Sequence, residues 1–221
     1  MAICADNLRK FYTVGGQTVK ALDGVSLDIA DGEYVTVVGT SGSGKSTLMN
    51  ILGCLDSPTS GSYILDGEDV SELSDNALSE IRSRKIGFIF QSFNLIPGLT
   101  ALENIELPLL YRKVPKAKRS AAALDALESV RLSDRALHRP RELSGGQQQR
   151  VAIARAIAAN PKVILADEPC GNLDSRSGAE VLDILNELNR NGKTIVMITH
   201  NEDTAKKAKR LIRISDGRVV N

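Results

Sequence analysis

The segment from Gly39 to Thr47 reads GTSGSGKST, a spacing of glycines, hydroxyls and one lysine that suits phosphate binding. Glycines let the backbone curl so that several N–H groups converge on phosphate oxygens, and a following helix adds its positive end. Lys45 supplies a charge for the terminal phosphates, and the Ser46 hydroxyl can ligate Mg²⁺. Because an apolar strand pattern precedes the segment and an apolar helical pattern follows it, we predict a P-loop rather than a flexible glycine–serine loop.

A second acidic element that could complete such a site is VILADE, Val163 to Glu168. Asp167 stands at the expected end of an apolar strand, where a carboxylate can hold magnesium through water. Glu168 follows it and could polarise an attacking water, which makes it the candidate general base for hydrolysis. The alternative is an acidic pair that merely solvates the end of a strand.

The stretch ELSGGQQQR, Glu142 to Arg150, has two adjacent glycines and a run of amides but no general base of its own. Ser144 has the residue type and position of an N-cap for a helix that begins with Gly145. Glycines at the positive end of a helix indicate that a charged group docks there. A capped helix that uses glycine for tight packing is the alternative.

The charge composition of the chain bears on whether it binds nucleic acid. The chain has 221 residues, with 28 Lys and Arg against 27 Asp and Glu, so its formal net charge is +1. This balance gives no electrostatic footprint for nucleic acid. Two basic runs, at Tyr111–Ser120 and Lys206–Arg210, lack the interleaved aromatics of a stacking platform and read as solvated helix faces. We therefore expect no nucleic-acid partner.

The chain also lacks the usual membrane signals. Its apolar runs are shorter than the ~18–20 residues of a membrane span, and its first residues do not form a signal peptide. Three widely spaced cysteines without a CxxC motif fit a reducing cytoplasm. We expect a cytoplasmic protein that meets a membrane only through a partner.

The elements needed to position these residues alternate along the chain, which predicts an α/β fold with a mainly parallel sheet and an N-terminal antiparallel β portion. One domain, 1–221, is expected, with a core at about 1–91 and 160–221 and an inserted α-helical lobe at about 92–159. Asp216-Gly217 predicts the turn of a terminal hairpin. The other expected elements are strands at 33–39, 162–167 and 193–200 and helices at 76–84 and 118–132.

The order of the P-loop, ELSGGQQQR, VILADE, GNLD and TH resembles the nucleotide-binding domain of ABC transporters over nearly the whole chain. IGFIFQSFNLIPGLTALENIELPL and ILGCLDSPTSG resemble the ATPases of the lipoprotein-releasing (LolD) and macrolide-exporter (MacB) group. This resemblance implies ATP and Mg²⁺ as cofactors and an ATP-dependent homodimer paired head to tail. Each signature motif then faces the P-loop of the other subunit, with Ser144, Gly145, Gly146 and Gln147 at the γ-phosphate.

The resemblance also implies roles for single residues. Gln91 matches a glutamine that senses Mg²⁺ and water, and His200 matches a histidine that contacts the γ-phosphate. Asp174 matches an aspartate that communicates across the dimer, and Tyr12 matches an aromatic that stacks on adenine. From the residues alone, Gln91 could be a surface amide, His200 a structural histidine and Tyr12 a core aromatic. The remaining nucleotide-binding set is the P-loop itself: Gly39, Thr40, Ser41, Gly42, Ser43, Gly44, Lys45, Ser46 and Thr47.

The implied function is that of an ATP-hydrolysing subunit that drives a separate permease, for export or extrusion of lipoprotein, peptide or antibiotic. Glu168, His200, Lys45 and Gln91 would carry catalysis, and Ser46, Gln91 and Asp167 would bind the metal. One departure is Cys170, where the group usually has threonine. The implied place is the inner face of the cell membrane. The alternative is a soluble ABC ATPase not tied to transport, for example of the iron–sulfur assembly type.

Overall fold

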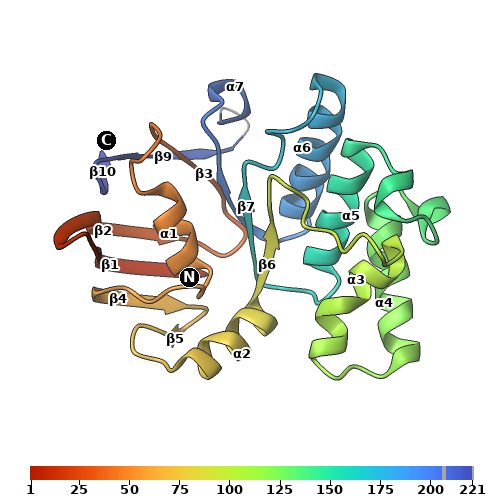
Figure 1. Ribbon diagram of the computed structural model, residues 1–221, viewed down its shortest axis with the longest axis horizontal. Helices are drawn as coiled ribbons and strands as arrows, with labels where there is room; N and C mark the ends of the chain where they lie inside the picture. The colour runs from red at the N-terminus through yellow and green to blue at the C-terminus, as the bar shows by residue number, and fades with distance from the viewer. Residues whose placement is uncertain (206–207, 221) are drawn as a thin grey trace.

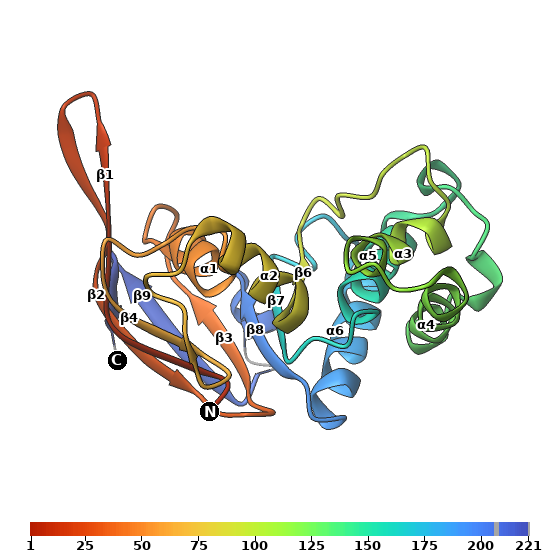
Figure 2. The ribbon, with the colours of Figure 1, turned by 90° about the horizontal axis from the view of Figure 1, so that it is seen from below.

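A computed structural model describes residues 1–205 and 208–220, so two residues of the basic run Lys206–Arg210 lie outside the described ranges. Near the N-terminus the chain forms an antiparallel sheet with the strand order β2-β1-β4-β5. In Figure 2 the hairpin of its first two strands projects beyond the body of the molecule. The strands of this sheet are β1 (Ile3–Val14), β2 (Gln17–Ile29), β4 (Ser60–Leu65) and β5 (Glu68–Asp69).

The second sheet has the order β10-β9-β3-β8-β7-β6, and all neighbours except β10 and β9 run parallel. The expected mixed α/β fold with a mainly parallel sheet is therefore confirmed. The terminal hairpin is also confirmed, since Asp216 and Gly217 both have positive φ, at 48° and 73°. The strands are β3 (Tyr34–Val38), β6 (Ile86–Ile89), β7 (Val163–Asp167), β8 (Thr194–Ile198), β9 (Arg210–Ser215) and β10 (Arg218–Val220).

Helices cover both faces of this sheet (Figure 1). Between β6 and β7 the described chain has helices and no strand, which agrees with the helical character expected there. Within the described ranges, none of the helices combines the length and the apolar character that a membrane crossing requires. The helical segments are α1 (Lys45–Leu52), α2 (Asp75–Lys85), α3 (Ala101–Tyr111), α4 (Lys116–Ser129), η1 (Ser133–Arg135), η2 (Pro140–Glu142), α5 (Gly145–Ile157), α6 (Ser175–Arg190) and α7 (Glu202–Ala205).

Two hydrophobic clusters lie on the two faces of the parallel sheet. Val35 and Val37 of β3 face the antiparallel sheet and α1, whereas Tyr34 of the same strand faces the cluster built by α3 to α6. Successive residues of a strand point to opposite faces, so a strand buried on both sides reads as a continuous apolar run. The runs at 33–39, 162–167 and 193–200 are of this kind.

The parallel pairing brings the carboxyl ends of β3, β8, β7 and β6 to one edge of the sheet. The segments that leave this edge are the P-loop after β3, Gln91 after β6, Glu168 after β7 and His200 after β8. In open α/β sheets, ligands bind outside the carboxyl ends of the strands. The fold thus gathers chemistry-bearing residues that are far apart in the sequence.

The contact between β6 and α5 leaves no room for a side chain at Gly87. A Cβ atom there would lie 2.5 Å from the Ala156 carbonyl oxygen of α5, and a backbone atom cannot swing aside. We predict that Gly87→Ala lowers the free energy of unfolding by about 1–3 kcal/mol, the usual cost of overpacking. Gly98→Ala is the control, because a Cβ atom at Gly98 meets nothing within 4 Å. Urea denaturation checks both; equal stability of the two variants would contradict this packing.

Candidate functional site

The P-loop connects β3 to α1, as its sequence predicts, and its glycines have identifiable steric reasons. A Cβ atom at Gly39 would lie 2.2 Å from the Ile214 carbonyl oxygen and 2.6 Å from Ser43 Oγ. Gly44 precedes the first helical residue with a φ of 103°, in the left-handed region that favours glycine. The loop therefore curls tightly against β9. Thr40, Ser41, Gly42 and Ser46 remain exposed along it.

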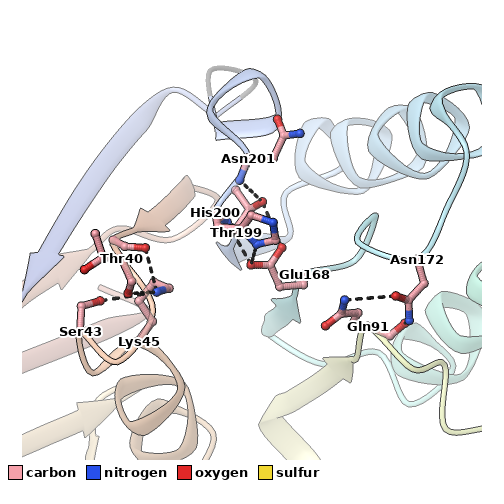
Figure 3. Close-up of polar contacts among 10 residues, drawn as sticks. Thr40, Ser43, Lys45, Gln91, Glu168, Asn172, Thr199, His200 and Asn201 are labelled. Carbon is pink, nitrogen blue, oxygen red and sulfur yellow. Dashed lines mark hydrogen bonds and ion pairs between the residues drawn. The ribbon is translucent and has the colours of Figure 1, made fainter.

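Lys45 lies across this loop. Its Nζ donates to the carbonyl oxygens of Gly39 at 2.9 Å and Thr40 at 2.7 Å, and it lies 3.5 Å from Ser43 Oγ (Figure 3). The ammonium charge is thus held in the concave side of the loop by groups that a phosphate could replace. A cation placed among converging backbone N–H groups is suited to bind the terminal phosphates of a nucleotide.

Glu168 turns from the end of β7 toward β8. Its φ is 47°, which is uncommon for a residue with a side chain and marks a strained turn at a functional position. The Glu168 carboxylate accepts hydrogen bonds from the His200 backbone N–H at 3.0 Å, His200 Nδ1 at 2.7 Å and Thr199 Oγ1 at 3.3 Å (Figure 3). The carboxylate side chain is 15% exposed and the imidazole 72%. With the carboxylate ionised, which leaves it only as an acceptor, this contact requires the His200 tautomer that carries a proton on Nδ1.

Asp167 is the last residue of β7, and its surroundings disfavour the ionised form of its carboxyl group. Burial raises the pKa of its carboxyl above the ordinary value, the negative charge of Glu168 raises it further, and Lys45 acts in the opposite direction. A divalent cation beside the carboxylate would offset both unfavourable effects.

Asp167 and Ser46 carry oxygen donors of the kind that magnesium takes. No group of three or more His, Cys, Asp and Glu side chains in the described part of the chain could hold a metal ion alone. Magnesium is usually held by one or two protein oxygens and completes its shell with phosphate oxygens and water. The exposed Ser46 hydroxyl and the Asp167 carboxylate are oxygen donors of this kind.

Gln91 follows β6 and pairs with Asn172, a residue that the sequence motifs did not single out. Gln91 Nε2 donates to Asn172 Oδ1 at 3.2 Å, and Asn172 Nδ2 donates to the Gln91 carbonyl oxygen at 3.1 Å (Figure 3). A Cβ atom at Gly171 would lie 2.7 Å from Gln91 Nε2. The loop after Glu168 and the loop after β6 are therefore joined by two reciprocal amide contacts.

The predicted N-cap at Ser144 is confirmed. Ser144 Oγ accepts from the Gln147 backbone N–H at 3.3 Å, and Gln147 Oε1 accepts from the Ser144 backbone N–H at 2.9 Å, which completes a capping box. The two glycines differ. A Cβ atom at Gly146 would lie 2.7 Å from Ser177 of α6, whereas one at Gly145 would make only ordinary contacts, 3.7 Å or more away. Gly146 therefore serves packing inside the chain, and the sequence did not distinguish the two.

The signature motif is not beside the P-loop of its own chain. In both ribbon views α1, which continues the P-loop, and α5, which continues the signature motif Leu143–Gln147, lie on opposite sides of β6 and β7 (Figures 1 and 2). The structure therefore brings Lys45, Glu168 and His200 to one edge of the sheet, and it leaves Ser144 and Gly145 away from the phosphate loop.

Asp174 has a local role in this chain. Its Oδ1 accepts from the backbone N–H groups of Arg176 at 3.0 Å and Ser177 at 2.9 Å, so it is the N-cap of α6. Its Oδ2 accepts from Ser177 Oγ at 2.7 Å. Since Ser177 also packs against Gly146, the start of α6 is tied to the signature helix.

Tyr12 lies on β1 in the projecting hairpin. Its phenol donates to Asp56 Oδ2 at 2.8 Å, and Lys10 Nζ, which bonds Asp56 Oδ1 at 2.6 Å, lies 5.1 Å from the centre of its ring. The ring is thereby fixed from one side without being buried in the core. Its stacking on adenine stays a prediction.

Cys170 lies between the Glu168 turn and α6. Its thiol donates a weak hydrogen bond to the Gly178 carbonyl oxygen at 3.6 Å. Burial, followed by the charge of Glu168, raises the pKa of this thiol to about 11. A thiol with so high a pKa is protonated at neutral pH and is a poor nucleophile.

Gln149 belongs to none of the candidate site residues predicted from the sequence, although its place on a helix points to it. It lies on α5 in the spacing 146, 149, 153 and 156, all of which are buried. An amide on the buried stripe of an amphipathic helix needs partners, and Gln149 finds them in the backbone near Gln91 and Glu168.

Comparisons with known proteins agree with this geometry. The family model described as "ABC transporter" matches residues 22–171. An uncharacterized ABC transporter ATP-binding protein of Thermotoga maritima is 54% identical over 95% of this chain and 90% of its own length. The macrolide export ATP-binding/permease protein MacB of Brucella melitensis is 51% identical over 98% of this chain, which spans 33% of that longer protein.

A solved structure extends the match to three dimensions. The ATP-binding cassette MJ0796, in a dimeric post-hydrolysis state bound to ADP and Pi, superposes with a TM-score of 0.90 at 46% identity, covering 99% of this chain and 97% of that one. The relatives include ATP-binding proteins of transporters, and the structural neighbour has completed hydrolysis. With a P-loop, a Glu168–His200 pair and a capped signature helix in one fold, the chain belongs to the ABC transporter family and is one of its ATP-hydrolysing cassettes.

Proposed function

We propose that this chain powers a separate membrane permease, pairing head to tail with a second copy around two ATP molecules. The carrying observation is that α5, with the signature motif at its start, and the P-loop helix α1 lie on opposite sides of β6 and β7 (Figures 1 and 2). The N-terminus of α5, with its serine cap and an unhindered Gly145, is suited to bind a phosphate group. A nucleotide on the P-loop of the same chain lies on the other side of β6 and β7 and does not provide that phosphate. A second copy in the reverse orientation supplies that phosphate.

Within each site the residues of this chain divide the work. The P-loop backbone and Lys45 bind and orient the phosphates, and the Tyr12 ring takes the adenine. Bound Mg²⁺, held by Ser46 and Asp167 with Gln91 nearby, would neutralise the charge that develops on the phosphates. Glu168 accepts the proton of the attacking water. His200 contacts the γ-phosphate, and its movement away from Glu168 frees carboxylate lone pairs for that water.

A cavity of about 900 Å³ suits the permease contact. It lies between α2, β6, and the ends of α3 and α5. Its walls combine apolar side chains, among them Leu55, Phe88 and Tyr111, with charged ones such as Arg84 and Arg112. Tyr111 is 81% exposed, which is unusual for an aromatic side chain without a partner. A groove of this kind accepts the apolar face of a short helix, as in other helix-in-groove contacts.

The kind of permease and the class of transported substrate are inferred by analogy with MacB. We propose export or extrusion of lipoprotein, peptide or antibiotic, because MacB carries macrolide export in its name and joins an ATP-binding part to a permease in one protein. In this scheme the chain lies on the cytoplasmic face of the cell membrane and reaches the membrane only through the permease.

Substitution at the cavity tests the transport role. Tyr111→Asp should remove a co-purifying multispan permease from detergent-solubilised membranes, because it places a charge on an apolar docking wall. ATP turnover of the isolated chain should be unchanged. Leu137→Asp is the matched control, since Leu137 is similarly exposed, at 78%, and lies outside the cavity. A permease identified by mass spectrometry with Leu137→Asp but not with Tyr111→Asp supports transport. Recovery of ribosomes or an assembly scaffold instead would contradict it.

Lys45→Ala should abolish ATP hydrolysis and strongly weaken nucleotide binding. The reason is that Lys45 is the one basic residue of the sequence Gly39–Thr47, and we expect turnover to fall at least about a hundredfold. Lys118→Ala, on an exposed position of α4, controls for the loss of one surface charge. Steady-state ATPase assays and nucleotide titrations provide the measurements, and near-normal turnover of Lys45→Ala would refute the P-loop assignment.

Glu168→Gln should trap the paired state. The variant keeps the size of the side chain but removes the basic carboxylate and one negative charge near the phosphates. We expect ATP to bind at least as well, hydrolysis to stop, and a dimer to accumulate with ATP and Mg²⁺, seen by light scattering.

Adding Ser144→Arg to this variant should abolish the dimer, because the side chain obstructs the approach to the partner's γ-phosphate. Ser144→Asp provides the finer control, since aspartate keeps the N-cap but repels phosphate, and it should abolish the dimer too. An ATP-independent oligomer indifferent to both substitutions, or parental hydrolysis by Glu168→Gln, would count against the proposed pairing.

A further inference from the structure

Gln149 is a fully buried amide in the middle of α5, at 0% exposure. Its Nε2 donates two hydrogen bonds, to the Pro169 carbonyl oxygen at 2.8 Å and to the Phe90 carbonyl oxygen at 3.3 Å. Its Oε1 is buried and has no hydrogen-bond partner among the described residues. One side chain of the signature helix therefore touches the backbone of two loops that lie far apart in the sequence.

Both acceptors adjoin residues to which we assign catalytic roles. Phe90 immediately precedes Gln91, and Pro169 immediately follows Glu168. The segment from Glu168 to Gly171 is a tight turn in which the Gly171 N–H donates to the Glu168 carbonyl oxygen at 2.9 Å. Gln149 holds that turn through the Pro169 carbonyl oxygen, which does not take part in the hydrogen bond that closes the turn. The orientation of the strained Glu168 backbone thus depends on a contact with α5.

The same helix holds the rest of the loop after β6. Arg155 donates through Nη2 to the Phe93 carbonyl oxygen at 2.8 Å and through Nη1 to the Asn94 carbonyl oxygen at 2.5 Å. Partial burial of this guanidinium lowers its pKa from the ordinary value. Gln149 and Arg155 together make α5 the element that sets the path of the chain on both sides of Gln91.

An apolar side chain of similar volume would remove the unpartnered Oε1, which destabilises the folded state, but it would leave the Phe90 and Pro169 carbonyl oxygens without this donor. What an amide supplies at this position, and an apolar side chain cannot, is the connection to these two loops. We propose that Gln149 is a positioning residue that couples the signature helix α5 to the catalytic loops of its own subunit, orienting Glu168 through Pro169 and Gln91 through Phe90. This inference rests on the roles proposed above for Glu168 and Gln91.

Gln149→Met tests the coupling, because methionine has nearly the same length and no N–H donor. We expect kcat for ATP hydrolysis by the isolated chain to fall about tenfold or more, as positional errors of catalytic groups do. The Kd for ATP should stay within about twofold, because no binding group is lost. The melting temperature should change by no more than a few degrees, because removal of the unpartnered oxygen offsets part of the cost of leaving the Phe90 and Pro169 carbonyl oxygens without this donor.

Gln148→Met is the matched control. It makes the same chemical change one position earlier, where the amide, among the described residues, donates to the Leu143 carbonyl oxygen at 3.1 Å and contacts neither catalytic loop through a hydrogen bond. Its kcat should stay within about twofold of the parent. A normal kcat for Gln149→Met would overturn the proposal. A joint fall of kcat, ATP affinity and melting temperature would also overturn it, because it would indicate a purely structural role.

The Glu168→Gln background separates positioning from assembly. Glu168→Gln with Gln149→Met should still form the ATP-dependent dimer, whereas Glu168→Gln with Ser144→Arg should not. Loss of the dimer with Gln149→Met would overturn the proposal, because Gln149 would then act on pairing. If Glu168→Gln alone hydrolyses ATP normally, the assignment of the base fails and the positioning of that base fails with it. An inactive Glu168→Gln beside a fully active Gln149→Met overturns the positioning role alone.

Discussion

The parallel pairing of β3, β8, β7 and β6 decides where the chemistry of this molecule can be. Parallel strands deliver their carboxyl ends to one edge, so the P-loop, Gln91, Glu168 and His200 meet there although the chain visits them in separate crossings. Each crossing returns through a helix, and these helices bury the two faces of the sheet. A loop at this edge is therefore anchored by a strand at one end and by a packed helix at the other.

The parallel pairing also places two neighbouring carboxylates at that edge of the sheet. Asp167 and Glu168 are neighbours in sequence, and two adjacent carboxylates at a partly buried strand end repel each other. The left-handed backbone of Glu168 relieves this by turning its carboxylate toward β8, where the His200 N–H, the imidazole and Thr199 receive it. Asp167 keeps a pKa raised by burial and by Glu168, which the charge of Lys45 partly opposes. The strained turn thus separates the two carboxylates into different surroundings, which is the arrangement that distinct roles for two acids require.

The sequence was informative wherever the determining interactions are local. The strands at 33–39, 162–167 and 193–200 could be predicted because each is a continuous apolar run, and the Ser144 cap because its partner Gln147 is three residues away. The contacts of Glu168 with His200 and of Gln91 with Asn172 span 32 and 81 positions, and no periodicity encodes them. Family resemblance named Gln91 and His200, but it gave neither partner. The different duties of Gly145 and Gly146 also depend on Ser177 of another helix, which a motif cannot reveal.

Along α5, successive turns contact different parts of the catalytic apparatus. Ser144 caps the start of α5, Gly146 packs on the start of α6, and Gln149 holds the turn after Glu168. Farther on, Arg155 holds the loop after β6, and the Ala156 backbone lies against Gly87 of β6. A helix packed this closely transmits a displacement as a whole, because dense interiors resist local compression. In the proposed head-to-tail pair, a phosphate bound at the Ser144 end would act on a helix already attached to both candidate catalytic loops, which would make chemistry in one site sensitive to the occupancy of the other.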